Sequence, residues 1–307
     1  MDHQSFMHET LLARVVAWAD RRDDIRAVLV VGSRARMDRP ADQWSDMDIV
    51  LVTSEPRRYL DWADWLDELA PTWLTFLEPT AVGEGTERRA LFDNAVDVDF
   101  IPFATAAMQT IAAQGWPAEI AGVIRRGMRV VLDKEGWAPR LALAANTSLT
   151  SAAEPPSAEG FANTVNDFWF HTVWTAKKLR RGELWTAIDC LTGYMLWRVL
   201  HMIEWHTQVT RGADVDTWHN GRFVEQWADP RVVAGLRQCF PRYDAADIAR
   251  GLLATMDLYR WLTRETAGAL GYDYPAWADE RATDWVRSCL NDLRETPTPR
   301  SASADRR

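Results

Sequence analysis

The chain has 307 residues, of which 47% are hydrophobic, and its 44 acidic and 35 basic residues give a formal net charge of −9. This length and balance predict a soluble protein of two ordinary domains. Because phosphate neutralisation supplies most of the affinity for nucleic acids, the acidic charge argues against a nucleic-acid partner and favours a cationic one.

Neither a membrane span nor a secretion signal is expected. No stretch approaches the roughly 18 consecutive apolar residues of a transmembrane helix, and Met1–Phe6 lacks a basic region followed by an apolar run. Cys190, Cys239 and Cys289 lie about fifty residues apart, without metal-ligand spacing, as expected of reduced thiols. We therefore expect a cytoplasmic protein with no membrane partner.

The first half of the chain alternates between helical and strand patterns. Two nearly continuous apolar runs, 25–31 and 47–53, are typical of strands buried on both faces. Asp93-Asn94 is a hairpin turn signal between two further strands. The full prediction comprises helices at 8–22, 57–70, 104–114 and 118–126, and strands at 25–31, 47–53, 73–77, 88–92, 96–103 and 128–132.

The second half shows helical patterns alone. A Ser/Pro/Ala-rich stretch, 147–160, reads as a linker between domains. Helices are predicted at about 161–181, 183–208, 231–240, 245–268 and 276–293, and the polar residues 294–307 are predicted to be a disordered tail. The predicted fold class is therefore α+β, with a mixed-sheet domain at 1–146 and an all-α helical bundle at 161–293.

A glycine and two carboxylates lie at the two ends of the loop that joins the first two predicted strands. Gly32-Ser33 ends the first strand, and Asp46-Met47-Asp48 opens the second. Asp46 and Asp48 should point to one side, with Cα atoms roughly 6.5–7 Å apart. Two carboxylates beside an apolar strand are costly without a cation, which a metal ion would supply. Gly32 and Ser33 offer backbone N–H groups and a hydroxyl suited to a phosphate tail.

A second acidic strand follows. Asp97 and Asp99 lie within Val96–Phe100, and either could complete a three-carboxylate site with Asp46 and Asp48. Three acids around two Mg²⁺ ions suit in-line phosphoryl transfer. A Gly-Ser pair or an Asp-x-Asp pair alone would mean little, but their order along the chain indicates this chemistry.

These residues resemble the signature of the DNA polymerase β-like nucleotidyltransferase superfamily. Within it, nearly the whole chain resembles the streptomycin (aminoglycoside) 6-adenylyltransferases. The resemblance rests on Val31-Gly-Ser-Arg-Ala35, Trp44-Ser-Asp-Met-Asp-Ile49, Leu91-Phe92, Val98-Asp-Phe100, Val131-Leu-Asp-Lys134, Asn166-Asp-Phe-Trp169, Ala176-Lys177, Arg181-Gly-Glu-Leu184, Glu204-Trp205 and Tyr274-Pro275.

The resemblance implies a nucleotidyltransferase domain over 1–146 and a helical domain that covers the cleft and helps bind the acceptor. It assigns Mg²⁺ to Asp46, Asp48 and Asp99; Asp99 is preferred to Asp97 because it precedes the Phe of the family's Asp-Phe pattern. Gly32 and Ser33 would hold the triphosphate. Arg34 is either a phosphate contact or a surface residue.

The helical half offers a candidate general base. Asp167, His171, Trp174 and Lys178 recur at one-face helical spacing. Asp167 matches the family's acidic residue before Phe-Trp, and a placed carboxylate can accept the proton of an acceptor hydroxyl. Its alternative role is a surface carboxylate paired with Lys178 or Arg180.

Several further residues have less definite roles. The cations Lys177, Lys178 and Arg181 are candidate phosphate contacts or solvated charges. His201 and His206, on either side of Glu204-Trp205, are interpreted as packing or acceptor-contact residues rather than zinc ligands.

The predicted function is Mg²⁺-dependent transfer of AMP from ATP to a hydroxyl of an aminoglycoside such as streptomycin. One alternative is another acceptor, such as a lincosamide or a protein hydroxyl. Another is a catalytically silent nucleotide-binding protein, which the intact Asp46, Asp48 and Asp99 disfavour. The modified hydroxyl, the choice between ATP and GTP and the oligomeric state stay open.

Overall fold

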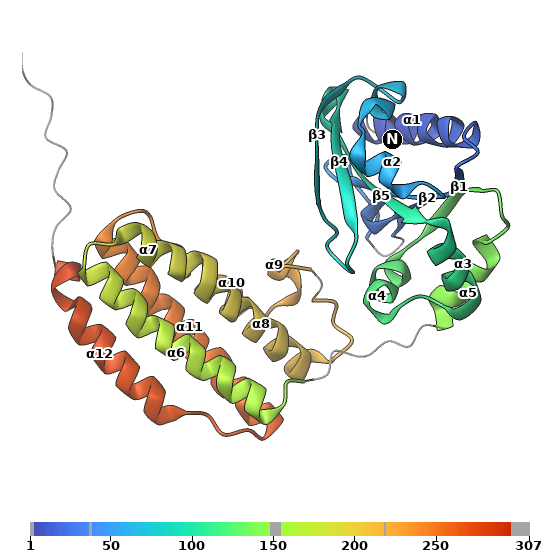
Figure 1. Ribbon diagram of the computed structural model, residues 1–307. Helices are drawn as coiled ribbons and strands as arrows, with labels where there is room; N and C mark the ends of the chain where they lie inside the picture. The colour runs from blue at the N-terminus through green and yellow to red at the C-terminus, as the bar shows by residue number, and fades with distance from the viewer. Residues whose placement is uncertain (1–2, 37–38, 148–154, 218, 296–307) are drawn as a thin grey trace, which may run out of the picture. The chain divides into compact units, whose positions relative to one another are not determined.

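The chain forms two compact units, Met1–Thr150 and Ser151–Arg307, in the computed structural model (Figure 1). The structure describes residues 3–36, 39–147, 155–217 and 219–295. No helix in these ranges is both long and apolar enough to cross a membrane. Each unit is described below by itself.

The first unit is built on a six-stranded sheet in the order β3-β4-β5-β2-β1-β6. β2 and β5 run parallel, whereas every other neighbouring pair is antiparallel, so the predicted mixed sheet is confirmed. The strands are β1 (Ile25–Val31), β2 (Met47–Thr53), β3 (Thr72–Pro79), β4 (Thr86–Phe92), β5 (Val96–Ala104) and β6 (Arg129–Asp133).

Helices cover both faces of this sheet. They are α1 (His3–Asp20), α2 (Pro56–Asp61), α3 (Thr105–Gln114), α4 (Ala118–Arg126) and α5 (Ala138–Thr147). Side chains alternate along β1: Val28 and Val30 pack into the core with α1, whereas Ala27 and Leu29 pack with α3, α4 and α5 (Figure 1). The result is a three-layer unit, and α5 is a helix that the sequence pattern did not predict.

The predicted helix 57–70 is wrong in its middle. It consists of α2 and a short 3₁₀ helix, η2 (Asp64–Glu68), with extended backbone at Trp62. The break lets Trp65 stack on Trp18, with ring centroids 5.3 Å apart, and donate a hydrogen bond to the Trp62 carbonyl at 3.0 Å. Aromatic packing therefore overrides the helical pattern of this segment.

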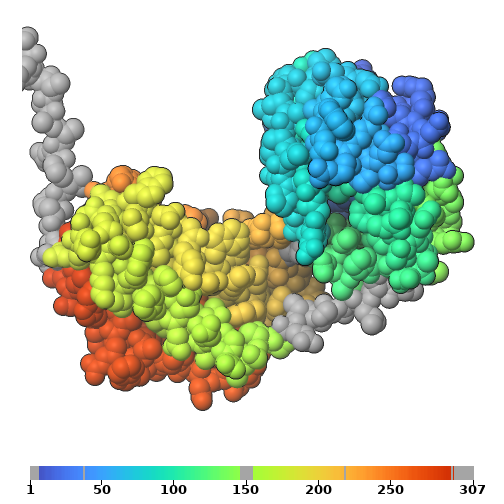
Figure 2. Space-filling view, viewed as in Figure 1, coloured from blue at the N-terminus to red at the C-terminus, as the bar shows by residue number. Residues whose placement is uncertain are grey.

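The described part of the second unit contains helices and no strands, as predicted. They are α6 (Ala158–Arg180), α7 (Leu184–Asp189), α8 (Leu196–Arg211), α9 (Val224–Trp227), α10 (Pro230–Cys239), α11 (Ala245–Leu270) and α12 (Ala276–Glu295). A π-helical turn, η4 (Cys190–Met195), joins α7 to α8. A single apolar core unites the bundle. α6 and α12 pack against each other and lie on the same face of the bundle (Figure 2).

The first and last helices of this unit extend beyond their predicted bounds. α6 begins inside the range predicted as a linker, because the Ser157 hydroxyl caps it by accepting from the Gly160 N–H at 3.1 Å. α12 continues to Glu295, two residues into the predicted tail. The rest of that tail, 296–307, and linker residues 148–154 lie outside the described residues.

Candidate active site

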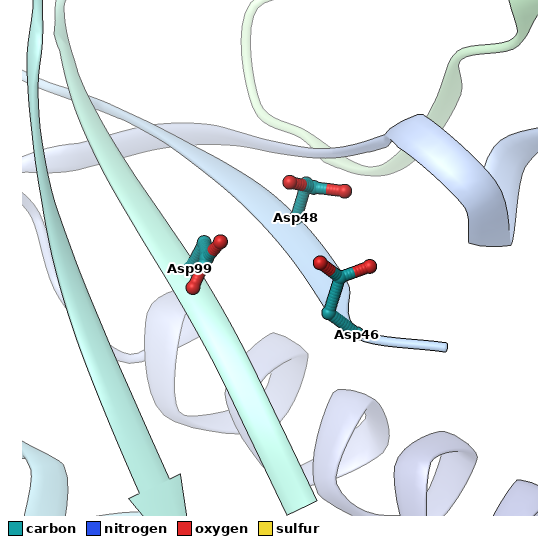
Figure 3. A group of neighbouring side chains, drawn as sticks. All are labelled: Asp46, Asp48 and Asp99. Carbon is teal, nitrogen blue, oxygen red and sulfur yellow. The ribbon is translucent and has the colours of Figure 1, made fainter. Parts of the chain in front are cut away.

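Three of the predicted carboxylates meet at one place in the first unit. Asp46 immediately precedes β2, Asp48 lies on β2, and Asp99 lies on β5. One oxygen from each lies within 4.8 Å of the others (Figure 3). The parallel register explains the meeting, because it pairs Asp48 directly with Asp99. We call these three residues the carboxylate triad.

Burial makes the triad electrostatically costly. Asp99 is only 5% exposed, and burial raises the pKa of its carboxyl. The hydrogen bond and charge of Arg89 oppose this rise, whereas the negative charges of Asp46 and Asp97 add to it. A cation between the three groups would relieve that cost. Carboxylate oxygens are also the ligands that Mg²⁺ prefers. The residues present therefore fit a divalent metal ion.

A cluster that the sequence reasoning missed adjoins Asp99. Arg89 on β4 is paired with Asp99 across the sheet, and its Nε and Nη2 donate to the two carboxylate oxygens at 2.9 and 2.5 Å. Glu78 lies 3.2 Å from Arg89 Nη1, and Glu87 lies 3.6 Å from Arg89 Nε. Burial, followed by the charge of Asp99, raises the pKa of Glu87 to about 7.

Gly32 lies against the triad because it has no side chain. It begins a 3₁₀ turn, η1 (Gly32–Ala35), directly after β1, with φ of +65°. A Cβ at this position would lie 2.0 Å from Asp48 Oδ2. The Ser33 hydroxyl lies 3.4 Å from the Asp46 carbonyl oxygen, to which it donates. The Gly-Ser turn and the triad are therefore parts of one site.

Arg34 supports the loop that leads into β2. Its guanidinium donates to the carbonyl oxygens of Ser45 at 2.7 Å, Asp46 at 3.1 Å and Asp42 at 3.3 Å. Burial is the largest effect on Arg34 and lowers its pKa. The side chain thus fixes the approach of Asp46 to the site, a role that the sequence pattern did not suggest.

Asp97, the alternative third carboxylate, lies outside the triad. It is exposed, and its Oδ1 is 4.0 Å from Nε2 of the buried His8 on α1. The interaction with His8 is the largest effect on Asp97 and lowers the pKa of its carboxyl. The geometry therefore places Asp99, and not Asp97, beside Asp46 and Asp48.

Comparison with known proteins identifies the family. The model of the family described as "Streptomycin adenylyltransferase" matches residues 7–289. The chain belongs to the streptomycin adenylyltransferase family. It is therefore a nucleotidyltransferase, as the sequence motifs predict.

Relatives of the chain include two proteins named aminoglycoside 6-adenylyltransferase. The one from Campylobacter jejuni is 24% identical over 88% of this chain and 90% of its own length. The one from Bacillus subtilis is 23% identical over 85% of this chain and 90% of its own length. Among solved structures, an aminoglycoside 6-adenyltransferase from Bacillus subtilis aligns over 92% of this chain and 97% of its own, with 17% identity and a TM-score of 0.43.

The candidate base, Asp167, lies on α6 in the helical unit, where side chains from η4 and α8 contact its carboxylate. The Asp167 carboxylate accepts hydrogen bonds from the Tyr194 hydroxyl at 3.0 Å and from Arg198 Nε at 2.9 Å. His171 Nδ1 lies 3.3 Å from Asp167 Oδ1. Lys178, suggested above as its ionic partner, instead pairs with Glu183 at 2.8 Å. The ionic partner of Asp167 is therefore Arg198.

The other predicted cations of the helical unit also have local contacts. Lys177 Nζ lies 5.6 Å from the ring centroid of Trp285, and Lys178 Nζ lies 5.1 Å from that of Trp174. Arg181 donates to Glu183. Contacts with phosphate by Lys177 and Lys178 stay predictions.

The α8 histidines pack against neighbouring side chains. His201 stacks on Trp205 with ring centroids 6.5 Å apart, and the buried His206 places Nε2 2.8 Å from Glu265. Between them, burial raises the pKa of Glu204 to about 7. These contacts favour the packing interpretation of both histidines.

Proposed function

We propose that this enzyme transfers an adenylyl group from ATP to a hydroxyl of an aminoglycoside such as streptomycin, with Mg²⁺ as its cofactor. The observation that carries the proposal is the carboxylate triad beside Gly32, in a chain of the streptomycin adenylyltransferase family. Relatives named for aminoglycosides support the choice of acceptor. The net charge of −9 suits a polycationic drug.

Asp46, Asp48 and Asp99 would hold the metal, two Mg²⁺ ions in the full site. When bound, Mg²⁺ would stabilise the negative charge on the attacking and leaving oxygens of the displacement. The chain's own residues would hold the nucleotide. Because Gly32 has no side chain, its backbone can lie close to Asp48. The N–H groups and hydroxyl of the Gly32-Ser33 turn are suited to binding triphosphate oxygens.

Asp167 is the proposed general base. The acceptor hydroxyl gives its proton to the base, its oxygen bonds to the α-phosphorus, and the bond to the leaving pyrophosphate breaks. The products are the AMP ester of the drug and pyrophosphate. Tyr194 and Arg198 would fix the direction of the Asp167 carboxylate, whose side chain is 27% exposed.

The test is a mass measurement on the purified full-length protein. ATP and Mg²⁺ are supplied with streptomycin in one reaction and with a lincosamide in another, and GTP replaces ATP in a third. With ATP as the donor, we expect streptomycin to gain the mass of one adenylyl group and pyrophosphate to be released. Modification of the lincosamide alone would contradict the assignment of an aminoglycoside as the acceptor, but the assignment as a nucleotidyltransferase would stand. Absence of product and pyrophosphate in every reaction would refute the proposal.

A further inference from the structure

Arg89 contacts Asp99 of the carboxylate triad but does not itself belong to the triad. The order β3-β4-β5-β2 places Arg89, Asp99 and Asp48 side by side, since the register pairs Arg89 with Asp99 and Asp99 with Asp48. Both oxygens of Asp99 accept from the guanidinium, at 2.9 and 2.5 Å. This two-point contact restrains the rotation of the carboxylate as well as its position.

The guanidinium is itself anchored on the side away from the triad. Its third nitrogen, Nη1, lies 3.2 Å from Glu78 on the neighbouring strand β3. Glu78 and Asp99 therefore hold the planar group from opposite sides. An arginine fixed in this way can impose a geometry on its partner, which a freely rotating cation could not.

We propose that Arg89 is a positioning residue for the metal site, which it serves by orienting Asp99. The inference rests on the proposed function, in which Asp99 is a metal ligand. Side chains that orient metal ligands typically contribute 10- to 100-fold to metal affinity. Arg89 would not touch the metal or the nucleotide in this role.

A different role for Arg89 predicts a change of cation affinity in the opposite direction. If the guanidinium served only to neutralise Asp99, its removal would leave more negative charge at the site, and a divalent cation would bind more tightly. If it orients Asp99, its removal would weaken cation binding despite the gain in negative charge. The direction of the change therefore separates orientation from neutralisation.

The experiment measures Mn²⁺ binding to the full-length protein by electron paramagnetic resonance, without any turnover. Arg89→Met removes the charge and the two-point contact, whereas Arg89→Lys keeps the charge and loses that contact. Arg57→Met is the matched control, because Arg57 forms an ion pair with Asp61 in the same unit and its side chain is 81% exposed. Asp99→Asn serves as the reference for loss of a ligand.

We expect Mn²⁺ affinity to fall at least about tenfold in Arg89→Met. We expect a smaller fall in Arg89→Lys and no change in Arg57→Met. Arg89→Lys keeps the test decisive if Arg89→Met does not fold, because it loses the two-point contact without a change of charge. Thermal unfolding identifies which variants are folded.

Two results would overturn the inference in distinguishable ways. Unchanged or tighter Mn²⁺ binding in the folded Arg89 variants, with weaker binding in Asp99→Asn, would show that Arg89 does not orient the ligand, and the proposed function would stand. If Asp99→Asn also bound Mn²⁺ as the wild type does, Asp99 would not be a metal ligand. That result would remove the metal assignment of the proposed function and the inference with it.

Discussion

Substitution of Gly32 by alanine should damage the site with little effect on the rest of the fold. Gly32 has φ of +65°, and a Cβ there would lie 2.0 Å from Asp48 Oδ2. Contacts shorter than 3.0 Å are essentially never made by real Cβ atoms, so the carboxylate or the turn must move by about 1 Å. Gly32→Ala therefore changes the position of the Asp48 carboxylate relative to the Gly-Ser turn without removing any functional group.

Two magnitudes follow from this geometry. The left-handed backbone costs an alanine roughly 1–2 kcal/mol, which lowers the unfolding midpoint by several degrees. A misplacement of about 1 Å at a reacting centre can cost on the order of a hundredfold in rate. We therefore expect kcat/KM to fall about a hundredfold, equivalent to roughly 2.7 kcal/mol of transition-state stabilisation.

Gly83→Ala is the matched control for backbone strain. Gly83 has φ of +74°, similar to that of Gly32, but a Cβ there would have no neighbour within 4 Å. Both variants should lose comparable stability in thermal unfolding, whereas only Gly32→Ala should lose AMP transfer in a steady-state assay. Equal losses of kcat/KM in the two variants, or wild-type activity in Gly32→Ala, would refute the reasoning.

Three further predictions concern carboxylates. Asp99→Asn should lower kcat/KM at least about tenfold more than Asp97→Asn, or roughly 1.4 kcal/mol, and the reverse order in steady-state kinetics would move the third ligand to Asp97. Asp167→Asn should lower kcat by about 10²–10⁴-fold, and a loss of stability at near-normal kcat would instead make Asp167 the structural partner of Arg198. Glu204→Gln should raise the thermal unfolding midpoint at about pH 8.5 but hardly at about pH 4. Burial raises the pKa of Glu204 from 4.5 to about 7, so its contribution to stability is present below pH 4.5 and lost as pH rises through 7; an equal shift at both pH values would contradict this cause.

The parts of the fold set by local pattern could be predicted from the sequence. The strands 25–31 and 47–53 coincide with β1 and β2, because continuous apolar runs are typical of strands covered on both faces. Strand alternation predicts that the side chains of Asp46 and Asp48 point to the same side. The family resemblance favours Asp99 over Asp97 as the third ligand, and the parallel pairing of Asp99 with Asp48 brings its carboxylate into the triad.

The contact between Arg89 and Asp99 depends on a single residue of register. A two-residue turn at Asp93-Asn94 would pair Arg88 with Asp99. The observed connection is a three-residue 3₁₀ turn, Asp93–Ala95, with positive φ at Asn94 and Ala95, and it pairs Arg89 with Asp99. Because a shift of one residue reverses the face of every side chain, the pattern alone could not assign Arg89 to the site.

Tertiary packing decided two further differences. Sequence spacing within a helix suggested Lys178 or Arg180 as the partner of Asp167, whereas the structure supplies Arg198 from α8. A contact between residues on different helices depends on how the bundle packs, which helical periodicity does not reveal. The break at Trp62 has the same kind of cause, because Trp65 is buried against Trp18 and Tyr59.

The most direct test of the account is AMP transfer to streptomycin by Asp48→Asn, measured by mass beside the wild type. Asp48 is common to the triad and to the contact with Gly32. Removing one charge from crowded carboxylates relieves repulsion, so the unfolding midpoint should stay the same or rise. The account predicts that the folded variant forms no adenylylated streptomycin under conditions in which the wild type does. Wild-type turnover by Asp48→Asn would contradict it.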